Sequence, residues 1–209
     1  MGLLDILLGR TKPVAPDLDR LFALPSAAVT LEAATGFTPT GRGAVCFATV
    51  EGAAFEQTHH EVQALLDADT DRTGPPVRLL RDEHGYSWLV SHRSPDELSL
   101  LVNDLHAVNS AMEVNGFGPQ LLCSLAGFAD TGGRDTDSRD TDGRDTDGRP
   151  LALVYLYKRG TFYPFAPLPG QEQRRDNALE LQVKAVLEDD LRLEPDLSRW
   201  FPVWGAPGL

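Results

Sequence analysis

The sequence is poor in cysteine and has no apolar run long enough to cross a membrane. Its two cysteines, Cys46 and Cys123, lie inside short apolar runs typical of strands, which predicts reduced, buried packing residues. A disulfide would need their Cα atoms to be close, which sequence does not show. A spanning helix needs about 20 apolar residues in succession. We therefore expect a cytoplasmic protein, at most peripheral to the inner face of the cell membrane.

Basic residues are also in short supply. Lys and Arg number 19 against 31 Asp and Glu, so the net charge is -12 and the pI is near 4.7. A protein that reads nucleic-acid backbones needs a basic face, so nucleic acid is not an expected partner. Any membrane contact would have to come from a local apolar element.

Catalytic signatures are missing too. The chain has no glycine-rich phosphate loop, no Gly-x-Ser-x-Gly elbow and no zinc-spaced Cys/His set. We expect a non-enzymatic protein without cofactor or metal. His59 and His60 are adjacent, and neighbouring positions on a helix point about 100° apart, which is unsuitable for holding one ion. His106 and Asp104 are interpreted as a partly buried histidine and a polar-face residue of one helix.

The amino terminus carries a short amphipathic pattern. Leu3, Leu4, Leu7 and Leu8 would share one face of a helix. No basic region precedes them and no small-residue cleavage site follows, so this is not a signal peptide. Two roles stay open: packing on the chain's own domain, or docking on a partner helix or bilayer surface. The predicted organisation is an N-terminal helical docking segment at residues 1–24 and one α+β domain at residues 25–209.

Strand and helix patterns alternate along that domain. β-type runs at residues 27–31 and 44–50 flank a Gly/Pro/Thr-rich stretch and predict a hairpin. A helix should follow, with Phe55, Val62, Leu65 and Leu66 at helical spacing. Residues 77–80 and 86–90 predict a second hairpin.

The clearest local signal is Ser94-Pro-Asp-Glu97, which combines a cap, a proline at the first helical position and a capping-box acid. It predicts a helix to about residue 115, stopped by Gly116, with a buried stripe at Leu98, Leu101, Val102, Leu105, Val108 and Met112. A third hairpin (121–128 and 151–157), an edge run (161–165) and a final helix (176–190) complete an antiparallel sheet built from hairpins, with helices segregated to one face.

An insert at residues 129–149 interrupts the third hairpin. It holds three copies of Arg-Asp-Thr-Asp-Ser/Gly, which lack apolar side chains and cannot build a core. Calcium is the competing interpretation, but Arg139 or Arg144 occupies the place of a ligand. We expect a disordered hairpin tip.

Aromatic and basic residues gather near the carboxyl end of this acidic chain. Such side chains are common at interface hot spots, although they could equally close the core. Together with the amino-terminal leucines, they form the predicted partner-binding set: Leu3, Leu4, Leu7, Leu8, Tyr157, Lys158, Arg159, Phe162, Tyr163, Arg174, Arg175, Trp200 and Trp204.

Several long phrases resemble the actinobacterial PspA-associated protein family, PspAB. They include Tyr-Leu-Tyr-Lys-Arg-Gly-Thr-Phe-Tyr-Pro-Phe at 155–165 and Arg-Trp-Phe-Pro-Val-Trp-Gly at 199–205, and others lie at 24–31, 104–109, 116–123 and 174–180. The resemblance implies association with PspA, a coiled-coil protein of the phage-shock membrane-stress response, and it supplies no catalytic residues. The alternative is an undescribed enzyme or small-ligand binder with a pocket among His59, His106 and residues 157–159.

Overall fold

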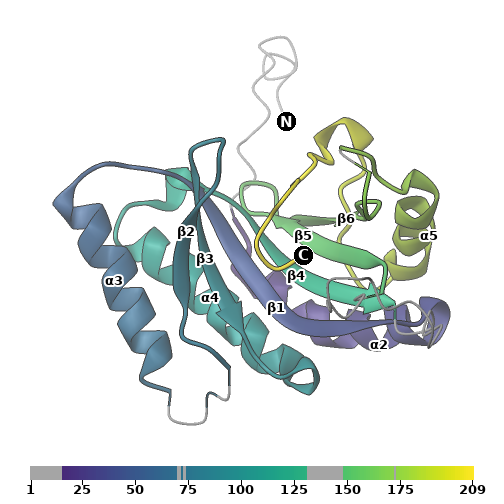
Figure 1. The fold of residues 1–209 in the computed structure, drawn as a ribbon, viewed down its shortest axis with the longest axis horizontal. Coiled ribbons are helices and arrows are strands. Elements are labelled where there is room, and N and C mark those ends of the chain that lie inside the picture. The colour runs from purple at the N-terminus through teal and green to yellow at the C-terminus, as the bar shows by residue number, and fades with distance from the viewer. Residues whose placement is uncertain (1–15, 70–71, 73, 131–147, 172) are drawn as a thin grey trace, which may run out of the picture.

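The computed structural model describes residues 16–69, 72, 74–130, 148–171 and 173–209. These residues build a six-stranded sheet and four α-helices, with short 3-10 turns between them (Figure 1). The strands are β1 (Phe37–Ala48), β2 (Arg78–Arg81), β3 (Tyr86–His92), β4 (Leu121–Asp130), β5 (Pro150–Leu156) and β6 (Thr161–Phe165). The helices are α2 (Leu24–Thr35), α3 (Ala53–Asp67), α4 (Leu98–Val114) and α5 (Asn177–Leu187).

The sheet has the order β2-β3-β1-β4-β5-β6, and every neighbouring pair is antiparallel. The predicted second and third hairpins are confirmed as β2–β3 and β4–β5, and residues 161–165 form the edge strand β6. Pro164 lies in this edge strand, where a missing N–H is tolerated.

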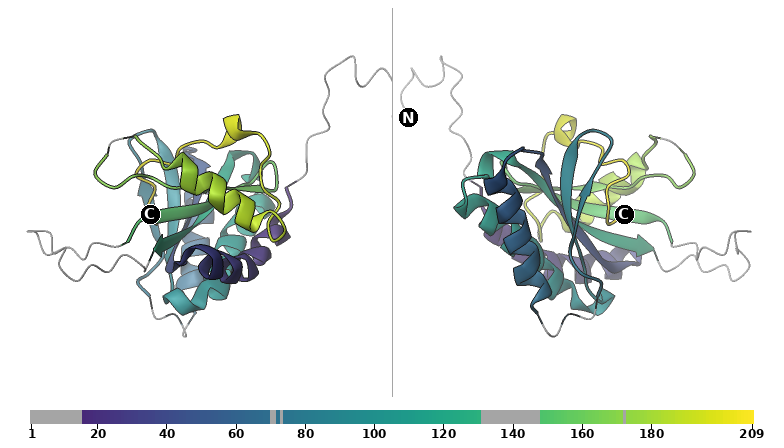
Figure 2. Two further views of the ribbon diagram at one scale, coloured as in Figure 1. Left: turned by 90° about the vertical axis from the view of Figure 1, so that its right-hand side faces the viewer. Right: turned by 60° about the vertical axis from the view of Figure 1, so that its left-hand side comes forward.

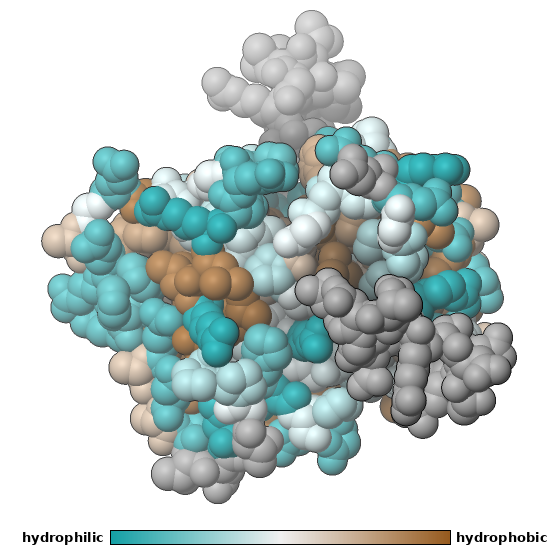
Figure 3. Space-filling model, in the orientation of Figure 1, coloured by the Kyte–Doolittle hydropathy of each residue, from teal (hydrophilic) through white to brown (hydrophobic). Residues whose placement is uncertain are grey.

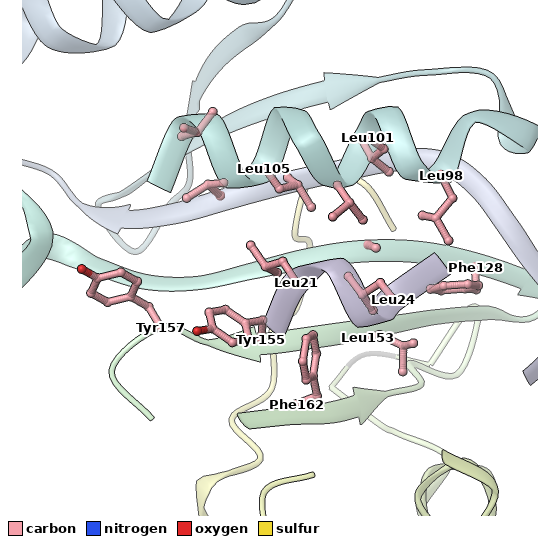
Figure 4. Close-up of a cluster of buried hydrophobic side chains, with 14 of the residues drawn as sticks. Leu21, Leu24, Leu98, Leu101, Leu105, Phe128, Leu153, Tyr155, Tyr157 and Phe162 are labelled. Carbon is pink, nitrogen blue, oxygen red and sulfur yellow. The ribbon is translucent and has the colours of Figure 1, made fainter. Parts of the chain in front are cut away.

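All four helices bury their apolar faces in one cluster on a single side of the sheet (Figure 2). Figure 4 shows Leu98, Leu101 and Leu105 of α4 beside Leu21 and Leu24, on the same side of the sheet as Phe128, Leu153 and Tyr155; all belong to one buried cluster. The predicted α+β class is confirmed, with helices segregated to one face. The predicted buried stripe of α4 is also confirmed, and Gly116 takes the left-handed conformation (φ 84°) just beyond the helix.

The opposite face of the sheet is covered in part by the carboxyl-terminal segment. Trp200 and Ala206 are buried there in a second apolar cluster. The same cluster contains Cys46 and Cys123, which lie directly opposite each other on β1 and β4 and are both free. Their burial was predicted. The hydrogen bond with Cys123 and burial both raise the pKa of Cys46, so its thiol is protonated.

The predicted first hairpin is wrong. Residues 27–31 belong to α2, not to a strand, because Leu24, Ala27, Ala28 and Leu31 recur at helical spacing and all four are buried. Helix packing therefore outweighs the β-propensity of Val29 and its neighbours.

The Gly/Pro/Thr-rich stretch that was interpreted as a turn is the first half of β1. A bulge between Pro39 and Gly43 bends the strand. Gly41 has φ 72°, and a Cβ there would lie 2.1 Å from the carbonyl oxygen of Arg93. Only glycine fits where β1 passes close to the backbone that follows β3. The Gly/Pro/Thr-rich residues therefore form a bend within a strand and not a turn between two strands.

The helix α3 confirms the predicted helix, with one exception. Phe55, Val62 and Leu66 are buried, but Leu65 is 67% exposed. The final helix is confirmed as α5, which buries Leu179, Val183 and Leu187.

The packed domain begins earlier than residue 25. Leu18, Leu21 and Leu24 are buried in the main cluster, and the Tyr155 hydroxyl donates to the carbonyl oxygen of Asp17. Among the described residues, the packing of the domain therefore extends back at least to Asp17. The four leucines of residues 3–8 lie outside the described residues, as do positions 131–147 of the insert. No helix within the described ranges is both long and apolar enough to cross a membrane.

Candidate partner-binding site

A groove of about 720 Å³ runs between α3 and the edge strand β2. Its apolar lining comes from Val50, Phe55, Leu79 and Leu80. Figure 3 shows an apolar patch at this place, bordered by hydrophilic residues. The polar lining consists of Glu51, Glu56, His59, His60, Arg81 and Ser87.

Local packing holds the α3 wall of the groove in place. Phe55 is buried and packs edge-on against Phe47 and Phe117, with ring centroids 5.5 and 5.1 Å apart. Phe55 thereby anchors the first turn of α3 to β1, and Glu56, His59 and His60 of the same helix line the groove. The floor is contributed by Leu79, which packs on the main core from β2.

The two adjacent histidines each place one ring nitrogen within hydrogen-bond distance of a backbone carbonyl of α3, their own helix. Nδ1 of His59 lies 3.1 Å from the Phe55 carbonyl oxygen, and Nδ1 of His60 lies 2.6 Å from that of Glu56. Burial lowers the pKa of His59, which favours the neutral ring. Within the described ranges, no three His, Cys, Asp or Glu side chains are grouped so that they could hold a metal ion.

His106 does not line this groove. It lies on α4, with its ring centroid 4.8 Å from that of Phe22 and Nε2 3.5 Å from Asp19. Neither His106 nor residues 157–159 line the groove that contains His59. The structure does not bring the alternative pocket together.

The predicted aromatic set divides into core and surface. Tyr157, Phe162, Tyr163 and Trp200 are each at most 6% exposed and pack inside the domain. Trp204 is half-buried, and its ring packs edge-on against Phe165 at 4.9 Å. The four buried aromatics therefore stabilise the fold and present no surface to a partner.

The basic residues of the set divide in the same way. Arg159 pairs with the buried carboxylate of Glu194, and Arg175 pairs with Glu180 and donates to the Trp200 carbonyl oxygen. Burial would raise the pKa of Glu194, but hydrogen bonds from Arg159, Thr161 and the Asp196 backbone bring it below its usual value. Lys158 and Arg174 are exposed.

Sequence reasoning missed the groove because it treated β2 only as half of a hairpin. A signal was present: Arg78-Leu-Leu-Arg81 places two leucines next to each other on a strand, so at least one of them faces away from the main core. Leu80 is 43% exposed on that account.

Comparison with known proteins supplies the remaining evidence. No curated protein and no solved structure matches the chain. The family model described as PspA associated protein B matches residues 1–208. The chain therefore belongs to the PspAB family, whose name indicates association with PspA.

Proposed function

We propose that this protein is a non-catalytic accessory protein that binds PspA in the phage-shock envelope-stress response. The observation that carries the proposal is the family match over residues 1–208. The groove between α3 and β2 supports it, since an open apolar lining with a polar border is typical of a protein-binding surface.

The placement of the ionisable residues supports a non-catalytic role. The buried carboxylates of Asp104, Glu180 and Glu194 are each paired with arginine inside the fold. The histidines of the alternative pocket lie in separate places. Nucleophilic catalysis would need a nucleophile and a base in mutual contact.

The test is calorimetric titration of the purified full chain with purified PspA. We expect saturable binding, and an unrelated acidic protein of similar net charge should show none. Absence of binding to PspA, both in solution and on vesicles that carry PspA, would contradict the proposal. Co-sedimentation with vesicles alone would measure any direct membrane contact.

A further inference from the structure

The two edges of the sheet differ in how they are closed. On the outer side of β6, Phe162 donates its N–H to the carbonyl oxygen of Arg192 and accepts from the N–H of Glu194. The chain itself therefore covers that edge. On the outer side of β2, Gln63 and Asp67 of α3 bind the backbone of Val77, directly before the strand. None of the four residues of β2 itself makes an additional hydrogen bond in the described part of the chain.

The pairing of β2 with β3 shows which backbone groups are open. Asp82 donates its N–H to the carbonyl oxygen of Tyr86, so this pair at the hairpin end is hydrogen-bonded. Hydrogen-bonded and non-hydrogen-bonded pairs alternate in an antiparallel ladder. In the register of β2 and β3, the N–H and C=O groups of Leu79 and Arg81 therefore point outward, into the groove beside α3.

Unpaired positive charge flanks these open groups. Arg78 and Arg81 are exposed, and neither makes an ion pair within the described ranges, although the whole chain carries a net charge of -12. Charged residues on an edge strand can simply deter aggregation. Protection against aggregation does not require an apolar groove beside the open edge. Together, the edge offers hydrogen bonds to a bound segment and the groove offers apolar contact.

We infer that β2 receives an extended segment of PspA as an additional antiparallel or parallel strand in this groove. Residues directly opposite in a sheet share a face, so the segment should place acidic side chains opposite Arg78 and Arg81 and apolar ones opposite Leu79 and Leu80. The matching pattern is acidic–apolar–apolar–acidic, which reads the same in both directions. The inference rests on the proposed function for the identity of the partner.

The groove also limits how acidic the segment can be. Glu51 and Glu56 line the wall on the α3 side. These two glutamates would repel a segment with a continuous run of acidic residues. A segment with only two carboxylates, placed opposite Arg78 and Arg81 by its pairing with β2, would instead be attracted by the arginines. The expected ligand therefore has two separated acidic residues around an apolar pair.

The first test uses a fluorescein-labelled peptide, Thr-Thr-Glu-Val-Val-Glu-Thr-Thr, and a twin with lysine in place of both glutamates. Fluorescence anisotropy with the full chain should show at least about tenfold tighter binding of the acidic peptide. The double variant Arg78→Glu/Arg81→Glu should reverse that preference. A matched control, Lys158→Glu/Arg174→Glu, makes the same charge change at exposed positions elsewhere and should leave the preference intact.

Backbone methylation distinguishes a strand from a helix. Adjacent amides of a strand point in opposite directions, so N-methylation of one valine should abolish binding and N-methylation of the other should leave it nearly unchanged. Equal loss with both peptides would overturn strand addition and favour a helix in the groove. Absence of binding at about 1 mM peptide, or an unchanged charge preference in the Arg78/Arg81 variant, would also overturn it.

Titration of the same two variants with PspA separates the inference from the proposed function. Weaker binding of the Arg78/Arg81 variant alone supports both. Normal binding of that variant, with loss in the Lys158/Arg174 variant, overturns the β2 site and leaves association with PspA standing. Binding of the peptide without binding of PspA would contradict the proposed association with PspA and the choice of PspA as the source of the segment. Strand addition at β2 would still be supported.

Discussion

Arg93 holds both carboxylate oxygens of Asp104, with Nε 2.9 Å from Oδ2 and Nη2 2.7 Å from Oδ1. Each side chain is only 3% exposed. The hydrogen bond with Asp104 raises the pKa of Arg93 further above its usual range. Arg72 and Ser91 also donate to Asp104, so this one carboxylate joins α4 to the end of β3 and to the chain that follows α3.

Asp104→Ala should lower the free energy of unfolding by about 3–5 kcal/mol. The variant removes the carboxylate that pairs with the buried guanidinium of Arg72 and leaves Arg93 with Asp69 alone, and a buried charge that loses its partner is strongly destabilising. Urea denaturation would measure the effect. Asp19→Ala, at an exposed carboxylate, is the control and should cause a much smaller change. An equally small change for Asp104→Ala would mean that the network contributes little.

Leu105→Ala should cost about 2–5 kcal/mol of unfolding free energy, because its side chain is 1% exposed between α4 and the sheet. Leu100→Ala removes the same atoms from the same helix, where the side chain is 37% exposed, and should cost far less. Similar losses in thermal or urea unfolding of both variants would contradict the assignment of the buried face.

Replacing residues 131–147 by Asn-Gly should change the unfolding free energy by no more than about 1 kcal/mol, because loop-closure entropy varies slowly with loop length. The deletion keeps the Asp130–Arg149 ion pair and the contact of Arg149 with the ring of Phe37. Calcium should not shift the melting temperature of the full chain. A rise of several degrees with calcium would indicate a bound ion instead.

Removal of residues 1–9 should leave the melting temperature unchanged, because the described packing begins at Asp17. If the segment docks on PspA, binding should fall about tenfold to a hundredfold, or about 1.4–2.8 kcal/mol. Leu4→Glu with Leu7→Glu should reproduce the loss in calorimetric titration. A truncated chain that melts well below the parent would assign the leucines to the chain's own core.

Glu194→Gln should weaken the acid dependence of stability. The pKa of Glu194 is below its ordinary value of 4.5 in the folded chain. Its ionised form therefore contributes stability that is present above about pH 4.5 and is lost as the pH falls through the folded pKa. The stability difference between wild type and variant, measured by urea titration from about pH 6 to pH 3, should shrink on acidification. A constant difference would contradict the ionic role.

Local signals in the sequence predicted elements well where capping and periodicity agreed. The capping box at Ser94 and Glu97 and the stripe of α4 specify both the start and the buried face of that helix. Residues 27–31 misled because the β-propensity of Val29 and Thr30 was weighed over a short run. The buried positions of the longer segment have helical spacing, and that pattern decides.

The candidate site was less predictable because it depends on which strand lies at an edge. Strand order is a property of the whole sheet, and nothing within Arg78–Arg81 states that this strand, β2, pairs on one side only. Burial of Asp104 was also missed. Its partners Arg72, Ser91 and Arg93 come from other parts of the fold, so a carboxylate on a helix was interpreted as polar-face surface.

The central place of β1 bears on the order in which the domain can fold. Val45 pairs with Leu89 on one side and with Ser124 on the other, so both partners of the strand follow it at long sequence separation. Sheets with such non-local pairing close slowly compared with helices. During synthesis β1 has no strand partner until α3 and the β2–β3 hairpin have followed. We expect early contact with α2, which precedes β1 directly, to shield its apolar face during that interval.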